Sequence, residues 1–394
     1  MIEGVSHPCL ADRIDGSPLS DAEIIVDFGI LPVPGLFFND AASAAGKACA
    51  VKLLRSRSSG LIQLDRDLNG ALYEYYKSGQ VSAAHRSYVQ AFAVELAARH
   101  PVQARILEIG GGQGYLMRAL REQGFTDLHI VDPSAEAGAS VQCNVIHDLF
   151  PGDMLQSGRR FDVIIAQHFL EHSPRPVAVL AAMQGLLSEG GYVYIEVPDI
   201  RASALEDNGE WLSATYALHS TYFSAETLTL AVEQAGLCVE DSRVVDHYGK
   251  SLVARLRAMT PGHIRYTGRV DSSEVTSAIV TYFNSLRSMG ARLTPGLPCW
   301  GAAERCLMVL GGLISGGFAP GVLVDSNPEI QGKFPATADI AVQPPTVLSA
   351  PLPELVVLAV PHARKIVEAN PHLIGPATLL HIPTKGSFLA SELF

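Results

Sequence analysis

The stretch that most constrains the fold of this chain is residues 104–124, ARILEIGGGQGYLMRALREQG. An apolar run of strand type leads directly into a glycine-rich turn, and the turn leads into a helical pattern. Glycines at such a turn lack β-carbons, so a ligand can lie against the backbone while the first amides of the helix point outward. The stretch therefore predicts an α/β domain that binds a ligand at the carboxyl end of this strand.

The spacing of the glycines indicates which ligand binds. Dinucleotide-binding turns need G-x-G-x-x-G, whereas Gly110, Gly112 and Gly114 follow Glu108 in an E-x-G-x-G-x-G arrangement that favours S-adenosylmethionine. Asp132 lies 18 residues after Gly114, at the tip of the next apolar strand, where an acid accepts hydrogen bonds from a ribose diol. We expect Glu108 to reach the methionyl end of the cofactor through water or a main-chain amide. In the alternative interpretation the glycines only form a tight turn and Asp132 only caps a helix.

Strands and helices continue to alternate after this turn. Further apolar strands lie in DLHIVDPS, FDVIIAQHFLEH and GGYVYIEVPD, and strands that alternate with helices of roughly 10–15 residues imply a parallel, doubly wound sheet. Ligands collect beyond the carboxyl ends of such strands, so we expect Gln167 and His168 to contact the cofactor and His172 to line the active site. Alternatively, His168 and His172 pack on one helix face as an i, i+4 pair.

The 394 residues are expected to form two or three domains, because one domain takes roughly 100–200 residues. Residues 1–68 show no long helical period and predict a small separate module. Residues 69–262 contain the glycine-rich turn, and residues 263–394 restart the alternation of strands and helices. The predicted fold class is α/β, with a class I (Rossmann-like) methyltransferase domain between a small N-terminal module and a second, C-terminal α/β domain of Rossmann-like type.

Composition and charge exclude several classes of function. Hydrophobic residues make up 48% of the chain and charged residues 18%, as in a compact soluble protein. The net charge is −11 and no run is rich in Lys or Arg, so nucleic-acid binding is not expected. Residues 306–324 carry no charge, but glycines and Pro320 interrupt them, so we expect a buried helix, turn and strand and no membrane span. No signal peptide precedes the six cysteines, which favours a cytoplasmic location with free thiols.

Three blocks of sequence carry a more specific signal. They are YEYYKSG at residues 73–79, YALHSTYFS at residues 216–224, and WGAAERCLMVLGGL…VDSNPEIQGKFPATADIAV between residues 300 and 342. Together they resemble the sugar-nucleotide C-methyltransferases of deoxysugar pathways, whose motifs are Y-x-E-H-x-x-x-F-S and, in the C-terminal domain, G-A-x-A-K…D-x-x-P-x-K-Q-G-x…P. The resemblance implies transfer of a methyl group from S-adenosylmethionine to a carbon adjacent to a ketone in a nucleotide-linked keto sugar.

The resemblance also implies roles for individual residues. His219 is the expected base that removes the α-proton, Tyr216 and Tyr75 are the expected hydrogen-bond donors around the enolate, and His172 is expected near the sugar. An imidazole suits this task because it titrates near neutral pH. In the alternative interpretation His219 is a histidine with satisfied hydrogen bonds at the entry to a helix.

Substrate contacts are expected at Tyr222, Arg305 and Lys333. Arg305 replaces a lysine of the family, and its planar guanidinium can bind a phosphate through two hydrogen bonds. A second family lysine is Ile330 here, so that charge is lost. These changes suggest an altered substrate.

The chain departs from the family at two other places. The C-x-x-C pairs that hold zinc in the family fall on Cys9, Asp12, Ser56 and Ser59, and hydroxyls are poor ligands beside thiolates, so zinc is not expected and no other metal site is predicted. Leu218 replaces the acid that precedes the catalytic histidine in the family. The partner that would orient this imidazole is therefore missing from its usual position.

Two alternatives remain open at this point. The enzyme could be an O- or N-methyltransferase that acts on a different small molecule, or the chain could be a ligand-binding relative that has lost C-methylation. In each case the partner is a small molecule, and the sequence predicts no oligomeric state.

Overall fold

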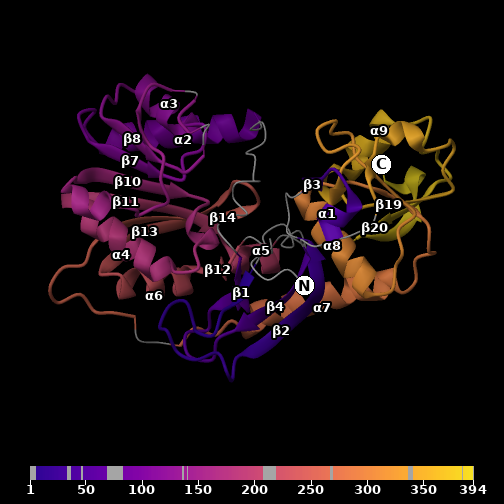
Figure 1. The fold of residues 1–394 in the computed structure, drawn as a ribbon, viewed down its shortest axis with the longest axis horizontal. Coiled ribbons are helices and arrows are strands. Elements are labelled where there is room, and N and C mark those ends of the chain that lie inside the picture. Colours follow the sequence, from indigo (N-terminus) through magenta and orange to yellow (C-terminus); the bar gives the residue numbers. More distant parts are fainter. Residues whose placement is uncertain are drawn as a thin grey trace.

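The structure of the chain is a computed structural model that describes residues 6–32, 37–45, 48–68, 83–134, 137–139, 141–206, 219–266, 269–335, 340–383 and 385–393. Figure 1 shows two α/β bodies at opposite ends of the molecule, with the long N-terminal strands β2 and β4 running below and between them. The first body contains the glycine-rich turn and the second contains the C-terminus. The boundaries predicted after residues 68 and 262 stay predictions.

A seven-stranded sheet forms the centre of the first body. Its strand order is β13-β14-β11-β10-β7-β8-β9, and β14 runs antiparallel to both neighbours while the remaining pairs are parallel. The strands are β7 (Ile106–Ile109), β8 (Leu128–Val131), β9 (Asn144–Ile146), β10 (Phe161–Gln167), β11 (Leu187–Pro198), β13 (Leu237–Asp246) and β14 (Lys250–Ala258). This topology is the class I (Rossmann-like) methyltransferase fold, so the predicted fold class is confirmed.

Helices cover both faces of this sheet (Figure 1). They are α2 (Ala83–Arg99) and α3 (Tyr115–Glu122) on one face, and α4 (Pro176–Leu186) and α6 (Ala225–Gln234) on the other. Side chains along β10 alternate between the two cores, because Val163 and Ile165 pack with α2 and α3 while Ile164 and Ala166 pack with α4 and α6. Since both faces are buried, β10 is apolar from Val163 to Ala166, and polar side chains follow from Gln167, where the strand ends.

The N-terminal segment forms an antiparallel sheet that includes one strand from the neighbourhood of His219. The order is β12-β5-β4-β2. The strands are β2 (Glu23–Pro32), β4 (Ala48–Arg55), β5 (Ile62–Leu64) and β12 (Thr221–Tyr222), and a separate pair joins β1 (Ser6–Pro8) to β6 (Arg66–Leu68). The amide of Leu64 also donates to the carbonyl of Ser220 at 3.1 Å. The N-terminal sheet therefore fixes the backbone directly after His219.

Hydrogen bonds hold the loops where the resemblance places zinc-binding cysteines. Ser59 Oγ donates to Asp12 Oδ2 at 2.5 Å, and Asp12 Oδ1 accepts the amide of Ile14 at 2.7 Å. The thiol of Cys9 donates to the carbonyl of Ala11 at 3.2 Å. These contacts tie the turn around Asp12 to the loop before β5.

The second body is built on a six-stranded sheet of order β18-β16-β15-β19-β20-β21, parallel except for the β20–β21 pair. Its strands are β15 (Pro298–Trp300), β16 (Val322–Val324), β18 (Val342–Gln343), β19 (Glu354–Val357), β20 (Leu379–Ile382) and β21 (Gly386–Leu389), with helices α7 (Ser273–Gly290), α8 (Glu304–Ser315) and α9 (Ala363–Ala369). Residues 306–324 form most of α8, a turn and β16, as predicted. Among the described residues, no helix combines the length and the apolar character that crossing a bilayer requires.

The second body and the N-terminal sheet share one buried core. Leu53 of β4, Leu286 of α7 and Leu310 of α8 belong to the same apolar cluster, and each is at most 1% exposed. Short elements add to this junction: β3 (Phe37–Phe38) pairs with β17 (Phe334–Pro335), α1 (Ala41–Ala45) lies between β3 and β4 in the chain, and α5 (Ile200–Glu206) contacts α7. The N-terminal segment thus connects the two bodies.

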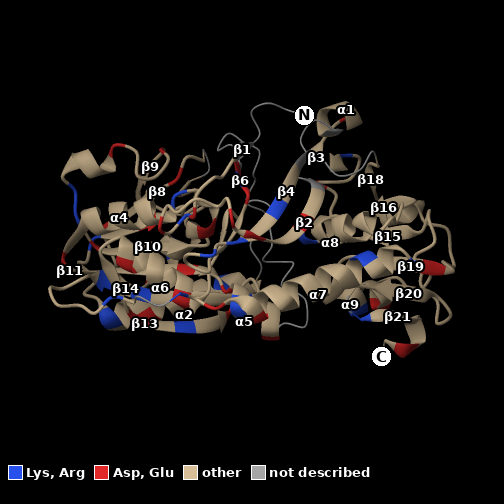
Figure 2. Cartoon of the chain, turned by 90° about the horizontal axis from the view of Figure 1, so that it is seen from below, with Lys and Arg blue, Asp and Glu red and all other residues tan. Residues whose placement is uncertain are grey.

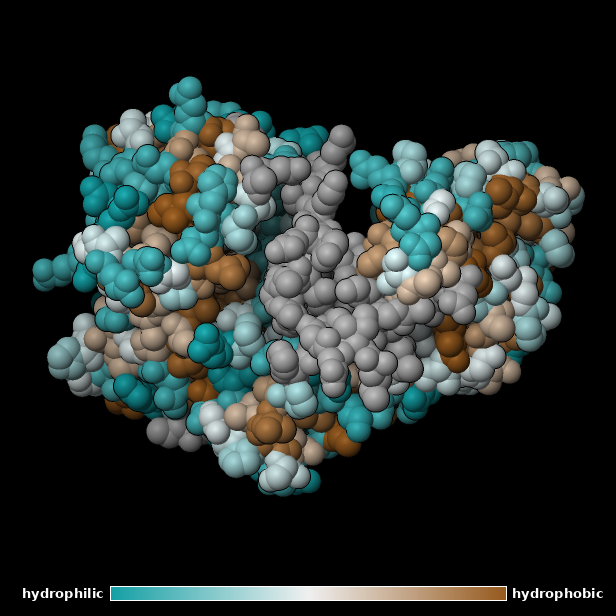
Figure 3. All heavy atoms as spheres, in the orientation of Figure 1, coloured by the Kyte–Doolittle hydropathy of each residue, from teal (hydrophilic) through white to brown (hydrophobic). Residues whose placement is uncertain are grey.

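Charged and apolar residues are both spread along the described elements. Figure 2 shows basic and acidic residues interspersed over the described elements, and Figure 3 shows hydrophilic and hydrophobic residues mixed over one face.

Candidate active site

The glycine-rich turn connects β7 to α3 at the carboxyl edge of the seven-stranded sheet. Gly110, Gly112 and Gly114 have φ angles of 70°, 49° and 80°, a left-handed conformation that glycine adopts without a steric penalty. A β-carbon at Gly110 would lie 2.8 Å from the ring of Phe169, whereas one at Gly112 would meet no atom within 4 Å. The turn therefore presents open space beside Gly112, where a ligand can lie against the backbone.

Asp132 and Glu108 lie on either side of this turn. Asp132, directly after β8, accepts the amide of Gly112 at 2.9 Å through Oδ2 and the amide of Ser134 at 2.8 Å through Oδ1. Glu108 is 6% exposed, and its Oε2 has no hydrogen-bond partner among the described residues. Burial, followed by the charge of Asp132, raises the pKa of Glu108 to about 8. A β-carbon at Gly111 would lie only 2.7 Å from this oxygen, so the acid sits directly beneath the turn.

These observations fit S-adenosylmethionine. The open backbone at Gly112 suits a ligand that lies on the turn, and the half-buried carboxylate of Asp132 suits a ribose diol. The unpaired oxygen of Glu108 is a buried polar atom that needs a partner, such as a cofactor group or a water bound with it. The five residues predicted to bind the cofactor at this turn therefore lie together at one edge of the sheet.

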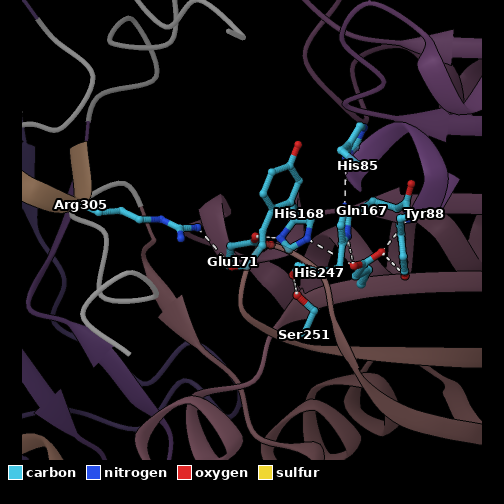
Figure 4. Close-up of polar contacts among 10 residues, drawn as sticks. His85, Tyr88, Gln167, His168, Glu171, His247, Ser251 and Arg305 are labelled. Atoms are coloured by element: carbon cyan, nitrogen blue, oxygen red, sulfur yellow. Dashed lines mark hydrogen bonds and ion pairs between the residues drawn. The ribbon is translucent and has the colours of Figure 1, made fainter. Parts of the chain in front are cut away.

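The next strand ends in a buried polar cluster (Figure 4). His168 follows β10 directly and lies between two carboxylates, with Nδ1 3.4 Å from Glu171 Oε1 and Nε2 3.3 Å from Glu196 Oε1. Burial opposes protonation of this imidazole, but the two carboxylates outweigh it and raise the pKa of His168 to about 9. Gln167, the last residue of β10, donates to Glu196 Oε2 at 2.6 Å. Both polar residues predicted at the end of β10 thus contact Glu196 of the adjacent strand β11.

A second histidine reaches Glu196 from the hairpin between β13 and β14. His247 Nδ1 lies 2.5 Å from Glu196 Oε1, and the other ring nitrogen of His247 lies 3.0 Å from His85 Nδ1 of α2. Tyr88 of α2 donates its hydroxyl to Glu196 Oε2 at 3.0 Å. Burial opposes ionisation of Glu196, yet His168 and His247 hold its pKa well below the usual range.

The predicted base lies beside a buried acid. His219 is 9% exposed, and its ring centroid is 4.7 Å from that of His172. A carboxylate oxygen of Glu171 and ring nitrogens of His172 and His219 all lie within 4.8 Å of one another. Glu171 is 1% exposed and forms no geometric hydrogen bond among the described residues. Burial opposes its ionisation, but its contact with His168 and the charges of the neighbouring histidines lower the pKa of Glu171.

The three predicted substrate contacts lie in different environments. Arg305, at the start of α8, extends toward the cluster in Figure 4 and donates to the carbonyl of Tyr248 at 3.2 Å. Tyr222 is 3% exposed in the core shared with the N-terminal sheet, and burial raises its pKa. Lys333 lies just before β17, which pairs with β3. Of these residues, only Arg305 contacts the hairpin that carries His247.

Some predicted residues cannot be placed. Tyr75, Tyr216 and Leu218 lie outside the described residues. Sequence reasoning missed Glu171, which stands inside the quoted motif FLEH, and Glu196, an acid in the otherwise apolar run YVYIEVP. An ionisable residue in such a run was the available signal, because a buried charge needs a partner.

Comparison with known proteins agrees with this geometry. A family model described as "Methyltransferase domain" matches residues 82–242. Among curated proteins, none matches the chain.

Solved structures with a similar fold include three methyltransferases. The magnesium protoporphyrin IX methyltransferase from Synechocystis PCC 6803, with bound SAM, shares 15% identity over 47% of this chain and 88% of its own, at a TM-score of 0.35. Mitomycin 7-O-methyltransferase shares 23% identity over 44% of this chain and 54% of its own, at a TM-score of 0.34. The CcbJ methyltransferase from Streptomyces caelestis shares 16% identity over 44% of this chain and 90% of its own, at a TM-score of 0.32.

The sheet order, the glycine-rich turn and the family match define the class of protein. Residues 82–242 are a class I methyltransferase domain. The chain therefore contains an S-adenosylmethionine-dependent methyltransferase domain, which confirms the predicted enzyme class and cofactor.

Proposed function

We propose that this enzyme transfers a methyl group from S-adenosylmethionine to a carbon adjacent to a ketone in a nucleotide-linked keto sugar, with His219 as the base. The observation that carries the proposal is the pairing of His219 with the buried carboxylate of Glu171 at the same sheet edge as the glycine-rich turn. The sugar class rests on the three sequence blocks that resemble sugar-nucleotide C-methyltransferases.

The methyl donor is bound by the turn. Gly110, Gly112 and Gly114 leave the backbone open to the ligand, Asp132 accepts hydrogen bonds from the ribose hydroxyls, and Glu108 donates or accepts at the methionyl end as a neutral acid. Bound S-adenosylmethionine supplies an electrophilic methyl group. Because the protein's own residues only orient that group, the chemical step depends on making the acceptor carbon nucleophilic.

His219 makes the carbon nucleophilic by removing a proton. The C–H bond adjacent to the ketone breaks, its proton passes to the imidazole, and its electron pair becomes the enolate. The enolate carbon then attacks the methyl carbon, and the carbon–sulfur bond of that methyl group breaks, which leaves S-adenosylhomocysteine. A positioned general base contributes roughly 10²–10⁴-fold to such a step. Donors to the enolate oxygen add to this effect, and Tyr216 and Tyr75 stay predicted for that role.

Glu171 takes over the role of the family's acid, whose position is occupied by Leu218 in this chain. The family's acid precedes the histidine in sequence, whereas Glu171 comes from the turn after β10 and lies within 4.8 Å of His219. A buried carboxylate beside an imidazole stabilises the imidazolium that forms when the base takes a proton. The same orientation is thus supplied from a different element of the fold.

The acceptor is held from the second body. Arg305 already contacts the hairpin at Tyr248, next to His247, and its guanidinium can bind a diphosphate through two hydrogen bonds. Lys333 and Tyr222 are kept as predicted substrate contacts. For Tyr222 the support is weaker, since its side chain is buried.

Product analysis with a panel of nucleotide-linked keto sugars tests the proposal. We expect S-adenosylmethionine turnover to yield a product with a new carbon–methyl bond in its NMR spectrum, and we expect His219→Asn to lower the rate by roughly 10²–10⁴-fold. An oxygen- or nitrogen-linked methyl group would contradict C-methylation. The matched control is His381→Asn, because His381 is also buried beside a carboxylate, Glu354 Oε2 at 2.9 Å, in the second body.

A further inference from the structure

The cluster at the ends of β10 and β11 contains more ligand-type atoms than the proposed reaction uses. His168, Glu196 and His247 each offer one ligand atom, and these atoms lie within 4.8 Å of one another. We propose that these three residues bind one divalent transition-metal cation, through two imidazole nitrogens and one carboxylate oxygen. The site belongs to the methyltransferase domain and is unrelated to the N-terminal positions where the family holds zinc.

Two of the three pairs of inner atoms have nearly the spacing that a cation requires, and the third pair lies within 4.8 Å. Two N or O ligands about 2.1 Å from a tetrahedral ion lie about 3.4 Å apart. His168 Nε2 is 3.3 Å from Glu196 Oε1, so this pair needs no movement. His247 Nδ1 is 2.5 Å from the same oxygen, and a side-chain rotation that separates the two atoms by about 0.9 Å would admit the ion.

The outer atoms of all three side chains are already held by other residues. His168 Nδ1 faces Glu171 Oε1 at 3.4 Å, which is the carboxylate–histidine arrangement that orients metal-binding imidazoles. His247 Nε2 faces His85 Nδ1 at 3.0 Å. Every outer ring nitrogen therefore has a partner, which leaves the inner nitrogens directed toward Glu196.

The two carboxylate oxygens of Glu196 also divide into an outer atom, which other residues hold, and an inner atom, which faces the centre of the cluster. Oε2 accepts hydrogen bonds from Tyr88 at 3.0 Å and from Gln167 at 2.6 Å, and Oε1 faces the two histidines. Such supporting hydrogen bonds fix the geometry of a carboxylate ligand.

Two independent features point to a ligand here. Among the described residues, the non-glycine residues with a left-handed backbone are His168, at φ 48°, and Tyr248, at φ 53°, which directly follows His247. Non-glycine residues held in this conformation cluster at functional sites. In addition, Nε2 of His168 is buried and forms no geometric hydrogen bond among the described residues. A cation at the centre of the cluster would coordinate both this nitrogen and Glu196 Oε1, which faces it at 3.3 Å.

The donor set selects the class of cation. Imidazole nitrogens suit Zn²⁺, Co²⁺, Ni²⁺ and Fe²⁺, whereas Mg²⁺ and Ca²⁺ prefer sites built from oxygen. Three protein ligands leave at least one position open, as in catalytic zinc sites. If the proposed function holds, a ketone oxygen of the acceptor could occupy that position and the cation would stabilise the enolate. That role rests on the proposed function, but the cation site itself does not.

The test is titration of the chelator-treated full-length protein with Co²⁺, followed by calorimetry and by the visible absorption of the ion. We expect one equivalent to bind, with a spectrum that reports nitrogen ligands, and we expect Zn²⁺ to displace it. Glu196→Gln should lower the affinity by at least roughly 100-fold, and Tyr88→Phe, which removes only a supporting hydrogen bond, by roughly 10–100-fold. His381→Ala removes a comparable buried imidazole in the second body and should bind Co²⁺ like the wild type.

Several outcomes would overturn the site. Wild-type protein that binds no stoichiometric Co²⁺ contradicts it, as does Glu196→Gln with unchanged affinity. Affinity that is lost in His172→Ala but kept in Glu196→Gln would place the cation at Glu171, His172 and His219 instead. Circular dichroism of each variant shows whether it is folded. If Glu196→Gln is not folded, the Co²⁺ affinity of Tyr88→Phe tests the site instead. Cation binding without methylation of any keto sugar would leave the site intact and refute the proposed function.

Discussion

Glu171 is the residue on which the base assignment depends most. Its carboxylate is buried, lies within 4.8 Å of the His219 ring nitrogen, and also contacts His168. Glu171→Gln keeps the shape and removes the charge that stabilises the imidazolium, so we expect the methylation rate to fall by roughly 10²–10⁴-fold with little change in the KM of the substrate. Glu354→Gln, which alters the comparable pair with His381, should retain the wild-type rate. A Glu171→Gln enzyme with full activity would remove Glu171 from the mechanism.

The raised pKa of Glu108 predicts that the free energy of unfolding depends on pH. Burial raises its pKa from 4.5 to about 8 in the folded chain. The folded state therefore holds this proton more tightly than the unfolded state, and the stabilisation that the proton provides is lost as the pH rises from about 4.5 to about 8, at up to roughly 1.4 kcal/mol per pH unit.

Urea unfolding at several pH values checks this prediction. We expect Glu108→Gln to remove this component of the slope and to be more stable than the wild type near pH 8, because the amide stays neutral. Identical slopes for both proteins would show that Glu108 is ionised in the folded chain at neutral pH.

At the scale of the element, the turn between β7 and α3 can be tested by a pair of glycines. Gly112→Ala places a β-carbon in open space at φ 49°, and Gly158→Ala does the same at φ 69° in a turn away from the cofactor. Each should cost roughly 1–2 kcal/mol of stability from backbone strain. Only Gly112→Ala should also weaken S-adenosylmethionine binding in calorimetry. Equal cofactor affinity in the two variants would contradict the placement of the cofactor on the turn.

The elements that were predictable from the sequence are those with a local signal. The apolar strand, turn and helix over residues 104–124 became β7, the glycine-rich turn and α3 because hydrophobic period and glycine position act over a few residues. His247 had no such signal. It lies 79 residues after His168 and reaches the cluster only because β14 inserts, antiparallel, between β11 and β13.

At the scale of the whole molecule, β12 couples the N-terminal sheet to the backbone next to His219. Tyr222 of β12 is 3% exposed, pairs with Ile62 and packs in the core shared with α7 and α8. We expect Tyr222→Ala to destabilise the protein by about 3–5 kcal/mol and to lower activity, because it releases the strand three residues after His219. Tyr266→Ala, at a side chain that is 40% exposed, should change stability by about 0.5 kcal/mol or less. Unchanged stability in Tyr222→Ala would refute this coupling.

The arrangement of the two bodies could not be predicted from the sequence. Arg305 was expected to bind substrate from its motif alone, and the structure brings it to Tyr248, 57 residues away, through the packing of α8 on the N-terminal sheet. Contacts between bodies depend on the summed shape and apolar area of several elements, which no local pattern encodes. The role of Glu171 was missed for the same reason, since the acid and His219 lie on different elements.

Solvent exchange at the acceptor carbon shows whether His219 removes a proton from that carbon. The wild-type enzyme is incubated in D₂O with a nucleotide-linked 4-keto sugar and without S-adenosylmethionine, and the sugar is analysed by mass spectrometry and NMR. We expect one deuterium to enter at the carbon adjacent to the ketone, and we expect His219→Asn to abolish this exchange while His381→Asn does not. Exchange in His219→Asn at the wild-type rate, or methylation of the sugar carbon without any exchange in the wild type, would contradict His219 as the base that forms the enolate.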